Sequence, residues 1–426
     1  MSFLENARTD HIRDCDVAVI GAGAIGVSVA YELAKAGRSV TVLERSDVCS
    51  GASYGNAGWV FPNHGAPLAR PGAIRKALRW LSNPAGPLYI KPRLSWSLMR
   101  WLFEFWRASN STASRRTFGL NRKLALRSLE LSEQWITEEG LDCYFGRPGV
   151  VLVCETEAGL SESIQDLETL RSFGGEATVL DRGDLLKKVP CLRAAPVGGI
   201  FFEGDGHLQP DKYVRGLSEA AEAKGAVFCL NTEVLGFEKE KGRISRIVTT
   251  RGDFRPAEVV LAAGVWSKSL GRSLNCRLPL EPAKGYSITV GQPSDGPQLP
   301  LLLRESKVAV TPMGKQLRFA GTLELSGLDP NVSLTRVDTV WSAACRHIRG
   351  VEFEPHFETW RGFRPCSPDD LPYIGRLNSV TNLTVATGHG MSGISQSAVT
   401  GRLVSQVITG HPLDIDIGPF GPERLS

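Results

Sequence analysis

Short apolar runs, a glycine-rich turn and one helical stripe alternate over the first 45 residues of the chain. Residues 16–20 are almost entirely apolar, a pattern typical of a strand buried on both faces of a parallel sheet. Residues 27–36 place their apolar side chains on one face, which predicts a helix that ends at Gly37. Residues 39–43 predict a second strand. The pattern is a strand–turn–helix–strand unit of an α/β fold.

Further strand patterns lie far along the chain. Residues 258–264 form an apolar run that ends in small residues, and residues 383–386 predict a strand followed by a glycine loop. A helix is expected over 394–409, with Ser392 as its N-cap. A sheet completed from such distant pieces implies a second domain nested inside the first.

The second domain carries an antiparallel pattern. Residues 308–322 predict a hairpin that turns at Met313 and Gly314. Residues 357–365 are a further strand candidate. These strands are expected to form one wall of a substrate site.

The composition is that of a globular protein with more than one domain. The chain has 426 residues, of which 42% are hydrophobic and 22% are charged, which excludes disorder and collagen. Nine cysteines without a CxxC pair and seven histidines without ligand spacing argue for a reducing compartment and against a metal site. The polar residues 1–14 do not resemble a signal peptide, and no run of about 18 apolar residues predicts a membrane span.

The charge is uneven. Residues 48–129 contain thirteen Lys or Arg, a single acid (Glu104) and five of the nine tryptophans. Within this segment, residues 94–107 predict a helix with one apolar stripe made of Leu94, Leu98, Trp101, Leu102 and Phe105. Two interpretations remain open: a helix that caps the second domain with its bases in solvent, or a patch that docks on an anionic membrane. No nucleic-acid-binding motif accompanies the bases, so a nucleic-acid partner is not expected.

The turn after the first strand has the spacing of a dinucleotide site. In the sequence Gly21-Ala22-Gly23-Ala24-Ile25-Gly26, the first glycine permits a tight turn, the second lets the backbone approach a pyrophosphate, and the third lets the helix pack on the strand. The helix N-terminus offers N–H groups to the phosphate. Glu44, 18 residues beyond Gly26, is placed to accept hydrogen bonds from a ribose. The motif alone does not distinguish NAD from FAD.

The sequence after Glu44 favours FAD. An NAD domain would continue with another strand–helix unit, but this chain enters a loop of small residues that includes Ser53, Asn56, Ala57 and Gly58. Such a loop lets the backbone approach a large flat ring. The glycine loop at 387–394 is a third cofactor-like segment, whose helix N-terminus would stabilise negative charge on a reduced flavin.

These segments, in this order, resemble the flavoprotein family of D-amino acid oxidases, glycine and sarcosine oxidases and bacterial D-amino acid dehydrogenases, and the dehydrogenase branch most closely. Residues 53–58 with 66–72, residues 284–287 and residues 361–369 carry that resemblance. It implies a Rossmann-like FAD-binding domain interleaved with a mixed β-sheet substrate domain, an α/β fold that is α+β overall. The expected FAD-binding domain comprises 1–69, 205–275 and 366–426, and the substrate domain comprises 70–204 and 276–365.

The resemblance also implies which residues contact FAD. One departure concerns Met391, because glycine oxidase-like relatives have an arginine there, so a second substrate anchor from this loop is not expected. The expected FAD contacts are Gly21, Gly23, Ala24, Ile25, Gly26, Glu44, Arg45, Ser53, Asn56, Ala57, Gly58, Val234, Ala263, Gly264, Gly388, Gly390, Met391, Ser392, Gly393 and Ile394.

Substrate recognition is expected to rest on an arginine, because a guanidinium holds a carboxylate through two parallel hydrogen bonds. Arg364 matches the arginine of the Gly-x-Arg-Pro segment that binds this carboxylate in related oxidases, and Arg318 is a weaker second choice. Arg361 lies three residues before Arg364, on the opposite strand face, so a structural role is expected. Tyr286 and His64 are further candidates for the pocket, and no residue is assigned as a general acid or base.

The implied activity is FAD-dependent dehydrogenation of a D-amino acid, with D-proline and D-hydroxyproline as candidates. The Cα hydrogen leaves as hydride to flavin N5, and the imine hydrolyses to a 2-oxo acid. The electrons are expected to reach a quinone or another respiratory acceptor, from the cytoplasm or from the inner face of the bacterial inner membrane. The alternatives are an oxygen-using glycine or sarcosine-type oxidase, and a flavin subunit that needs partner subunits.

Overall fold

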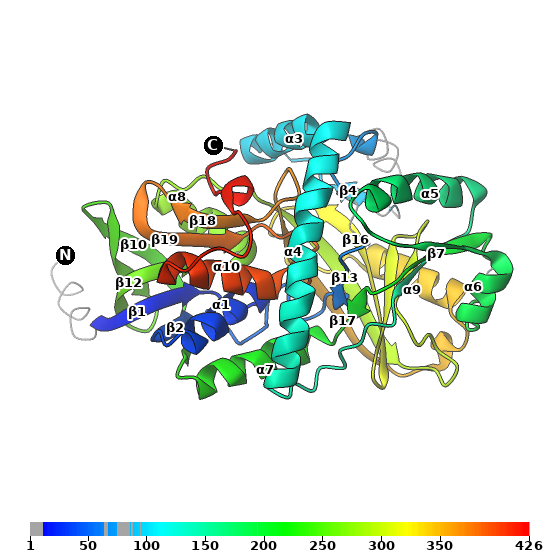
Figure 1. Cartoon of the computed structure of the whole chain (residues 1–426), viewed down its shortest axis with the longest axis horizontal. Helices are drawn as coiled ribbons and strands as arrows, with labels where there is room; N and C mark the ends of the chain where they lie inside the picture. Colours follow the sequence, from blue (N-terminus) through cyan, green and yellow to red (C-terminus); the bar gives the residue numbers. More distant parts are fainter. Residues whose placement is uncertain are drawn as a thin grey trace.

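The protein is described by a computed structural model that covers residues 12–63, 67–74, 86, 88–93, 95–193 and 195–425. Within these ranges two large mixed sheets lie side by side (Figure 1), one of eight strands and one of nine, and two further strands form a separate small ladder. The fold class predicted from the sequence is confirmed, since the chain has a Rossmann-like half interleaved with a mixed-sheet half.

The first sheet is parallel at its centre. Its parallel strands run in the order β9-β2-β1-β12-β19, and antiparallel strands extend it on one side. Its eight strands are β1 (Ile12–Ile20), β2 (Val40–Leu43), β9 (Val227–Cys229), β10 (Val234–Glu240), β11 (Arg243–Thr249), β12 (Asp253–Leu261), β18 (Tyr373–Leu377) and β19 (Val380–Thr387). Strands β1, β12 and β19 are neighbours although they come from the beginning, the middle and the end of the sequence.

Helices pack on this sheet, and together with it they enclose the largest apolar core in the described chain. Figure 1 shows α1 and α10 side by side, with α4 crossing over them. At the crossing of α1 and α10, a side chain on Gly401 would place its Cβ 2.5 Å from the carbonyl oxygen of Ser28. The helices are α1 (Ala24–Lys35), α4 (Ser111–Glu138), α7 (Pro210–Ala223), α8 (Ser267–Ser273) and α10 (Ser397–Thr409), and the short 3-10 turns are η1 (Gly264–Trp266) and η3 (Gly418–Phe420).

The second sheet has the order β17-β13-β16-β15-β14-β5-β7-β6, with β4 paired to β16. Helix α9 packs on one face, and a core centred on Ile288, Phe319 and Val340 lies between them. The strands are β4 (Leu88–Ile90), β5 (Val150–Cys154), β6 (Thr178–Asp181), β7 (Gly198–Phe202), β13 (Glu281–Gly291), β14 (Leu301–Leu303), β15 (Val308–Met313), β16 (Gln316–Leu325) and β17 (His356–Cys366). The helical elements of this half are α3 (Trp96–Ala108), α5 (Glu157–Ser172), α6 (Arg182–Lys188), α9 (Leu334–His347) and η2 (Val351–Phe353), and β3 (Trp59–Val60) pairs with β8 (Gly206–His207).

Three predicted boundaries shift. Helix α1 begins at Ala24, so that Gly26 lies in its first turn. Helix α10 begins at Ser397 with Gln396 as N-cap, rather than at 394 with Ser392, because the chain first makes a separate turn in which Ser397 N–H donates to the Ile394 carbonyl. The β15–β16 hairpin turns at Gly314 and Lys315 rather than at Met313 and Gly314.

The described strands of the two sheets come from separate stretches of sequence. The first sheet uses 12–43, 227–261 and 373–387, and the second uses 88–90, 150–202 and 281–366. The domain boundaries expected from the sequence stay a proposal. They place α4 in the substrate domain, whereas α4 packs against α10 of the other half. Among the residues that the structure describes, no helix is both long and apolar enough to cross a bilayer.

The α1–α10 crossing makes a stability prediction. Gly401→Ala should lower the free energy of unfolding by about 1–3 kcal/mol, the usual cost of overpacking, because the new methyl group would meet the α1 backbone rather than a movable side chain. Chemical denaturation of the FAD-loaded protein measures this. Gly216→Ala in α7 is the matched control, because its Cβ would contact only the Leu141 side chain 3.2 Å away. An equal loss in both variants would contradict the close helix approach.

Candidate active site

The turn between β1 and α1 has no space for side chains. Gly21 adopts φ +105°, and a Cβ there would lie 2.7 Å from the carbonyl oxygen of Ala262. A Cβ on Gly26 would lie 1.9 Å from the Gly21 carbonyl oxygen. Both glycines are therefore required sterically, and the N-terminus of α1, where a phosphate is expected to bind, follows directly after this turn.

The end of β2 places an acid over this turn. One carboxylate oxygen of Glu44 accepts the N–H of Ala22 at 2.9 Å, and the other accepts the N–H of Ser46 at 2.9 Å. The next side chain, Arg45, stacks its guanidinium on the Trp266 ring at 3.8 Å. Gly264, just before Trp266, has φ +54°, and a Cβ there would meet no described atom within 4 Å, so this edge is open.

The small-residue loop lies against the same turn. The Ser53 hydroxyl accepts the N–H of Ala24 at 2.9 Å, which caps the helix from outside. The Asn56 side chain closes the loop, since it donates to the Ser53 carbonyl at 2.7 Å and accepts the Gly58 N–H at 2.8 Å. Gly58 has φ +69°, and a Cβ there would lie 2.1 Å from the Leu208 carbonyl oxygen. The loop is thus held in a fixed conformation against the β1–α1 turn.

The C-terminal glycine loop joins these segments. Thr387 donates its hydroxyl to the Gly264 carbonyl at 2.9 Å, and Gly390 donates its N–H to the Pro365 carbonyl at 3.0 Å. His389 is buried, with Nε2 3.0 Å from the Thr400 hydroxyl, and burial lowers its pKa to about 3. His389 is therefore neutral at physiological pH and is unsuited to act as a general base.

The residues fit a flavin dinucleotide. Three backbone loops and the α1 N-terminus meet at the carboxyl ends of β1, β12 and β19, where ligands bind in open α/β sheets. The steric limits at Gly21, Gly26 and Gly58 leave a surface of backbone suited to a pyrophosphate and a flat ring. Of the expected contacts, Val234 is buried in the core at the start of β10, and Met391 is 50% exposed. Their roles stay predictions.

Arg364 lies near the C-terminal end of β17, the strand at one edge of the second sheet. Its Nη1 donates to the Thr322 carbonyl at 3.0 Å, and burial lowers the pKa of the guanidinium. Gly285 makes room for it, because a Cβ there would lie 2.1 Å from Nη1. Across the described residues no carboxylate pairs with Arg364. Arg364 is a half-buried cation without a carboxylate partner among these residues, two residues from Cys366, which pairs with His389 of the glycine loop, and it is therefore suited to bind an anion.

The strand geometry separates the other candidates from Arg364. Tyr286 lies on the α9 face of the sheet, where its hydroxyl donates to Glu324 at 2.9 Å, and Lys284 approaches the same carboxylate at 3.2 Å. Arg361 donates to the Pro330 carbonyl at 3.0 Å, in agreement with the structural role expected for it. The structure therefore does not bring Tyr286 to Arg364.

Arg318 lies on the Arg364 face, and its Nε and Nη1 donate to protein groups. Its Nη1 donates to the carbonyls of Tyr54 and Asn56 at 3.1 and 3.2 Å, and its Nε donates to Thr289 at 3.0 Å. These contacts tie the small-residue loop to β13 and β16. His64 lies outside the described residues.

Two features of the site were missed by sequence reasoning. Trp360 packs on Gly55, since a Cβ there would lie 2.2 Å from its indole ring, and it lies on the same face of β17 as Arg364. Its signal in the sequence is the glycine two residues later, Gly362, which also makes room for the ring.

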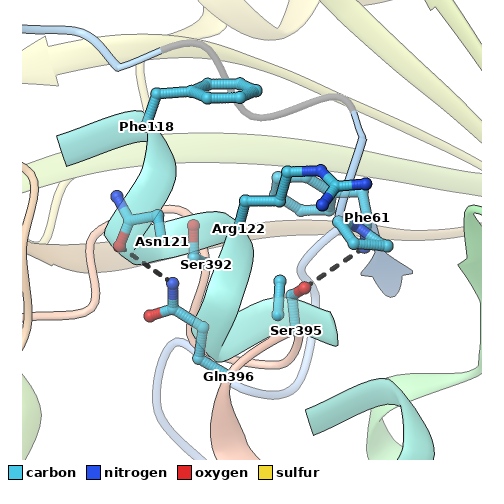
Figure 2. Close-up of a pocket in the computed structure, with 9 residues that line it drawn as sticks. Phe61, Phe118, Asn121, Arg122, Ser392, Ser395 and Gln396 are labelled. Atoms are coloured by element: carbon cyan, nitrogen blue, oxygen red, sulfur yellow. Dashed lines mark hydrogen bonds between the residues drawn. The ribbon is translucent and has the colours of Figure 1, made fainter. Parts of the chain in front are cut away.

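The second feature is a small cavity of about 20 Å³ under α4, beside the glycine loop (Figure 2). Gln396 donates to Asn121 at 3.1 Å, while its own carbonyl oxygen and the Nε of Arg122 have no partner in the described part of the chain. A cavity of this size with two such groups suits one water molecule. The interaction depends on contact between α4 and the glycine loop, which are some 270 residues apart, so no sequence pattern reveals it.

Comparison with known proteins agrees with this geometry. The model of the family described as FAD dependent oxidoreductase (DAO) matches residues 16–407, and the chain belongs to this family. Its members use FAD, which confirms the predicted cofactor and enzyme class.

Curated relatives include the D-amino acid dehydrogenases of Cereibacter sphaeroides, 33% identical over 96% of this chain and 95% of the relative, and of Allorhizobium ampelinum, 32% identical over 96% and 98%. Among solved structures, glycine oxidase from Geobacillus kaustophilus superposes with a TM-score of 0.79 at 25% identity, covering 97% of this chain and 99% of that one. L-proline dehydrogenase from P. horikoshii superposes at 0.74 with 19% identity, covering 97% and 98%. The predicted family resemblance is confirmed.

The burial of His389 makes a pH prediction. Its pKa of about 3 in the folded state lies below the ordinary value of 6.5, so the unfolded chain takes up the proton first as pH falls. The contribution of neutral, buried His389 to the free energy of unfolding is complete above pH 6.5. As the pH falls from 6.5 to 3, this contribution decreases by up to about 1.4 kcal/mol per pH unit.

Unfolding free energies at pH 7 and pH 5 test this for the wild type and for His389→Gln, which should lose less stability on acidification. The exposed His411→Gln is the matched control and should follow the wild type. The same pH dependence in all three proteins would contradict a buried neutral His389.

Proposed function

We propose that this protein dehydrogenates a D-amino acid, with Arg364 binding the substrate carboxylate. The observation that supports this most directly is the guanidinium of Arg364, which lies half-buried beside the cofactor loops without a carboxylate partner in the described chain. The names of the curated relatives support the substrate class. D-proline and D-hydroxyproline are the first candidates to test.

The protein's contribution to the reaction is orientation. Bound FAD would supply a two-electron acceptor for the hydride that leaves the substrate Cα. Arg364 fixes the carboxylate, and the Thr322 carbonyl holds one guanidinium nitrogen so that the others can face the substrate. Trp360 and the loop held by Arg318 exclude water from the same face of the sheet. With His389 neutral and buried, no general base is assigned, and the substrate amine has to bind uncharged.

The predicted roles of the other candidates are revised in this proposal. Arg318 positions the small-residue loop rather than the substrate, because its three hydrogen bonds go to protein groups. Tyr286 supports the sheet from the α9 side. The FAD contacts are those expected from the sequence, led by Gly23, Glu44 and Ser53.

The identity of the electron acceptor distinguishes the proposed dehydrogenase from the alternative functions. A quinone or another respiratory acceptor would make the enzyme a dehydrogenase that works in the cytoplasm at the inner membrane, whereas oxygen would make it an oxidase of the glycine or sarcosine type. Glycine oxidase from Geobacillus kaustophilus shares the fold. The experiments below therefore compare oxygen with a dye or quinone as the electron acceptor. A flavin subunit that requires partner subunits would be inactive alone and active in a co-purified complex.

The first prediction for this function concerns flavin reduction. Anaerobic addition of a D-amino acid, tested across D- and L-amino acids, sarcosine and hydroxyproline isomers, should bleach the absorbance of the FAD-loaded protein. The D-isomers are expected to react and the L-isomers are not. Turnover should require a dye or quinone and release little peroxide. Protein that binds no FAD, or that is reduced only by L-isomers, would overturn the proposal.

The second prediction concerns the anchor. Arg364→Ala should raise KM for the amino acid roughly tenfold or more, because a charged hydrogen-bonded pair is lost. Arg361→Ala is the control, since its side chain lies on the other face of β17 and should leave KM within about twofold. Steady-state kinetics with retained FAD absorbance measure both. Unchanged kinetics in Arg364→Ala would remove this residue from the site.

A further inference from the structure

Helix α3 carries large apolar side chains on two adjoining faces. The inner face carries the predicted stripe, apart from Leu94, which lies outside the described residues: Leu98 and Trp101 are buried, and Leu102 and Phe105 pack against the cluster that includes Leu325 of the second sheet. Trp101 also donates its indole N–H to the Cys366 carbonyl at 2.9 Å. The helix is thus held firmly at the surface (Figure 1).

The outer face is unusual because it is apolar as well. Trp96 is 91% exposed, Met99 60%, Phe103 53% and Trp106 59%. Their spacing of three, four and three residues places them in one line along the helix. Isolated exposed apolar residues are ordinary, but four large ones in a row on one element indicate a surface that is covered in use.

Basic residues lie near this line of exposed apolar side chains. Arg100 and Arg107 flank it on α3, and Arg107 is 62% exposed with only Glu104, at 3.3 Å, as a partner among the described residues. Arg116 follows on α4, exposed and without an ion pair within the described ranges. The surrounding segment 48–129 has thirteen bases and one acid.

We infer that the outer face of α3 docks on an anionic lipid surface. Aromatic side chains enter the headgroup boundary, and the arginines pair with lipid phosphates, which is the pattern of interfacial amphipathic helices. A second copy of this chain fits less well, because two such faces in contact would bring arginines against arginines, with Glu104 as the one acid on each α3 and already paired with Arg107. The inference goes beyond the proposed reaction and does not depend on it.

Flotation of the FAD-loaded protein with phosphatidylcholine vesicles, with and without phosphatidylglycerol, tests the inference. The wild type should float with the anionic vesicles and be released by salt. Trp96→Ser combined with Trp106→Ser should lower the partition coefficient roughly tenfold or more, since binding scales with the apolar area buried. Phe353→Ser is the matched control: Phe353 is 85% exposed but lies on η2, outside α3, and should bind like the wild type.

The charges are tested separately. Arg100→Gln and Arg116→Gln should each lower binding about fivefold, equivalent to about 1 kcal/mol per base at an anionic surface. These polar substitutions also keep the test valid if the tryptophan variant folds poorly. FAD content and turnover with a soluble dye should stay unchanged in every variant, because none of these side chains contacts the site.

Three results would overturn the inference. The wild type fails to prefer anionic vesicles, or the α3 variants float as well as the wild type, or sedimentation shows a dimer that the tryptophan substitutions convert to a monomer. The last result would assign the face to a second copy. Flotation requires no turnover, so it is decided independently of the reaction.

Discussion

The structure depends on close approach of backbone to backbone at one edge of the first sheet. Side chains are excluded there by distances as short as 1.9 Å between a Cβ on Gly26 and the Gly21 oxygen. Since β1, β12 and β19 end at this edge, three segments that are remote in sequence meet there. The helices behind the sheet pack just as tightly, as at Gly401. Binding of a large flat cofactor follows from this arrangement, because backbone occupies less space than any side chain.

The two halves of the molecule are joined by a few polar contacts at that edge. Arg318 reaches from β16 to the carbonyls of the small-residue loop, and Gly390 pairs with β17 beside Arg364. These hydrogen bonds fix the small-residue loop and the glycine loop relative to the strands of the second sheet. Arg318, which the sequence offers as a second substrate anchor, holds the small-residue loop through two of these hydrogen bonds.

Sequence reasoning succeeded where the pattern is local. The glycine motif, Glu44 and the strands on either side of α1 follow from spacing alone, and the two later cofactor segments follow from small residues after apolar runs. It could not place Tyr286, because the face of a strand depends on register, and the positive φ of Thr322 marks an irregularity in β16 opposite β13. It found only one stripe of α3, since burial decides which of two apolar faces meets the core. The contact of Gln396 with Asn121 is purely tertiary.

The hydrogen bond from Trp101 to the Cys366 carbonyl has a thermodynamic consequence. It connects the surface helix α3 to the strand that carries Arg364, two residues away. Any displacement of α3 that alters the end of β17 alters the affinity of the anchor for a carboxylate. Linkage would then make the effect reciprocal, so that substrate bound at the proposed anchor would change the affinity of α3 for the proposed lipid surface by the same factor. A single indole N–H is the direct connection between the surface helix and the strand that carries Arg364.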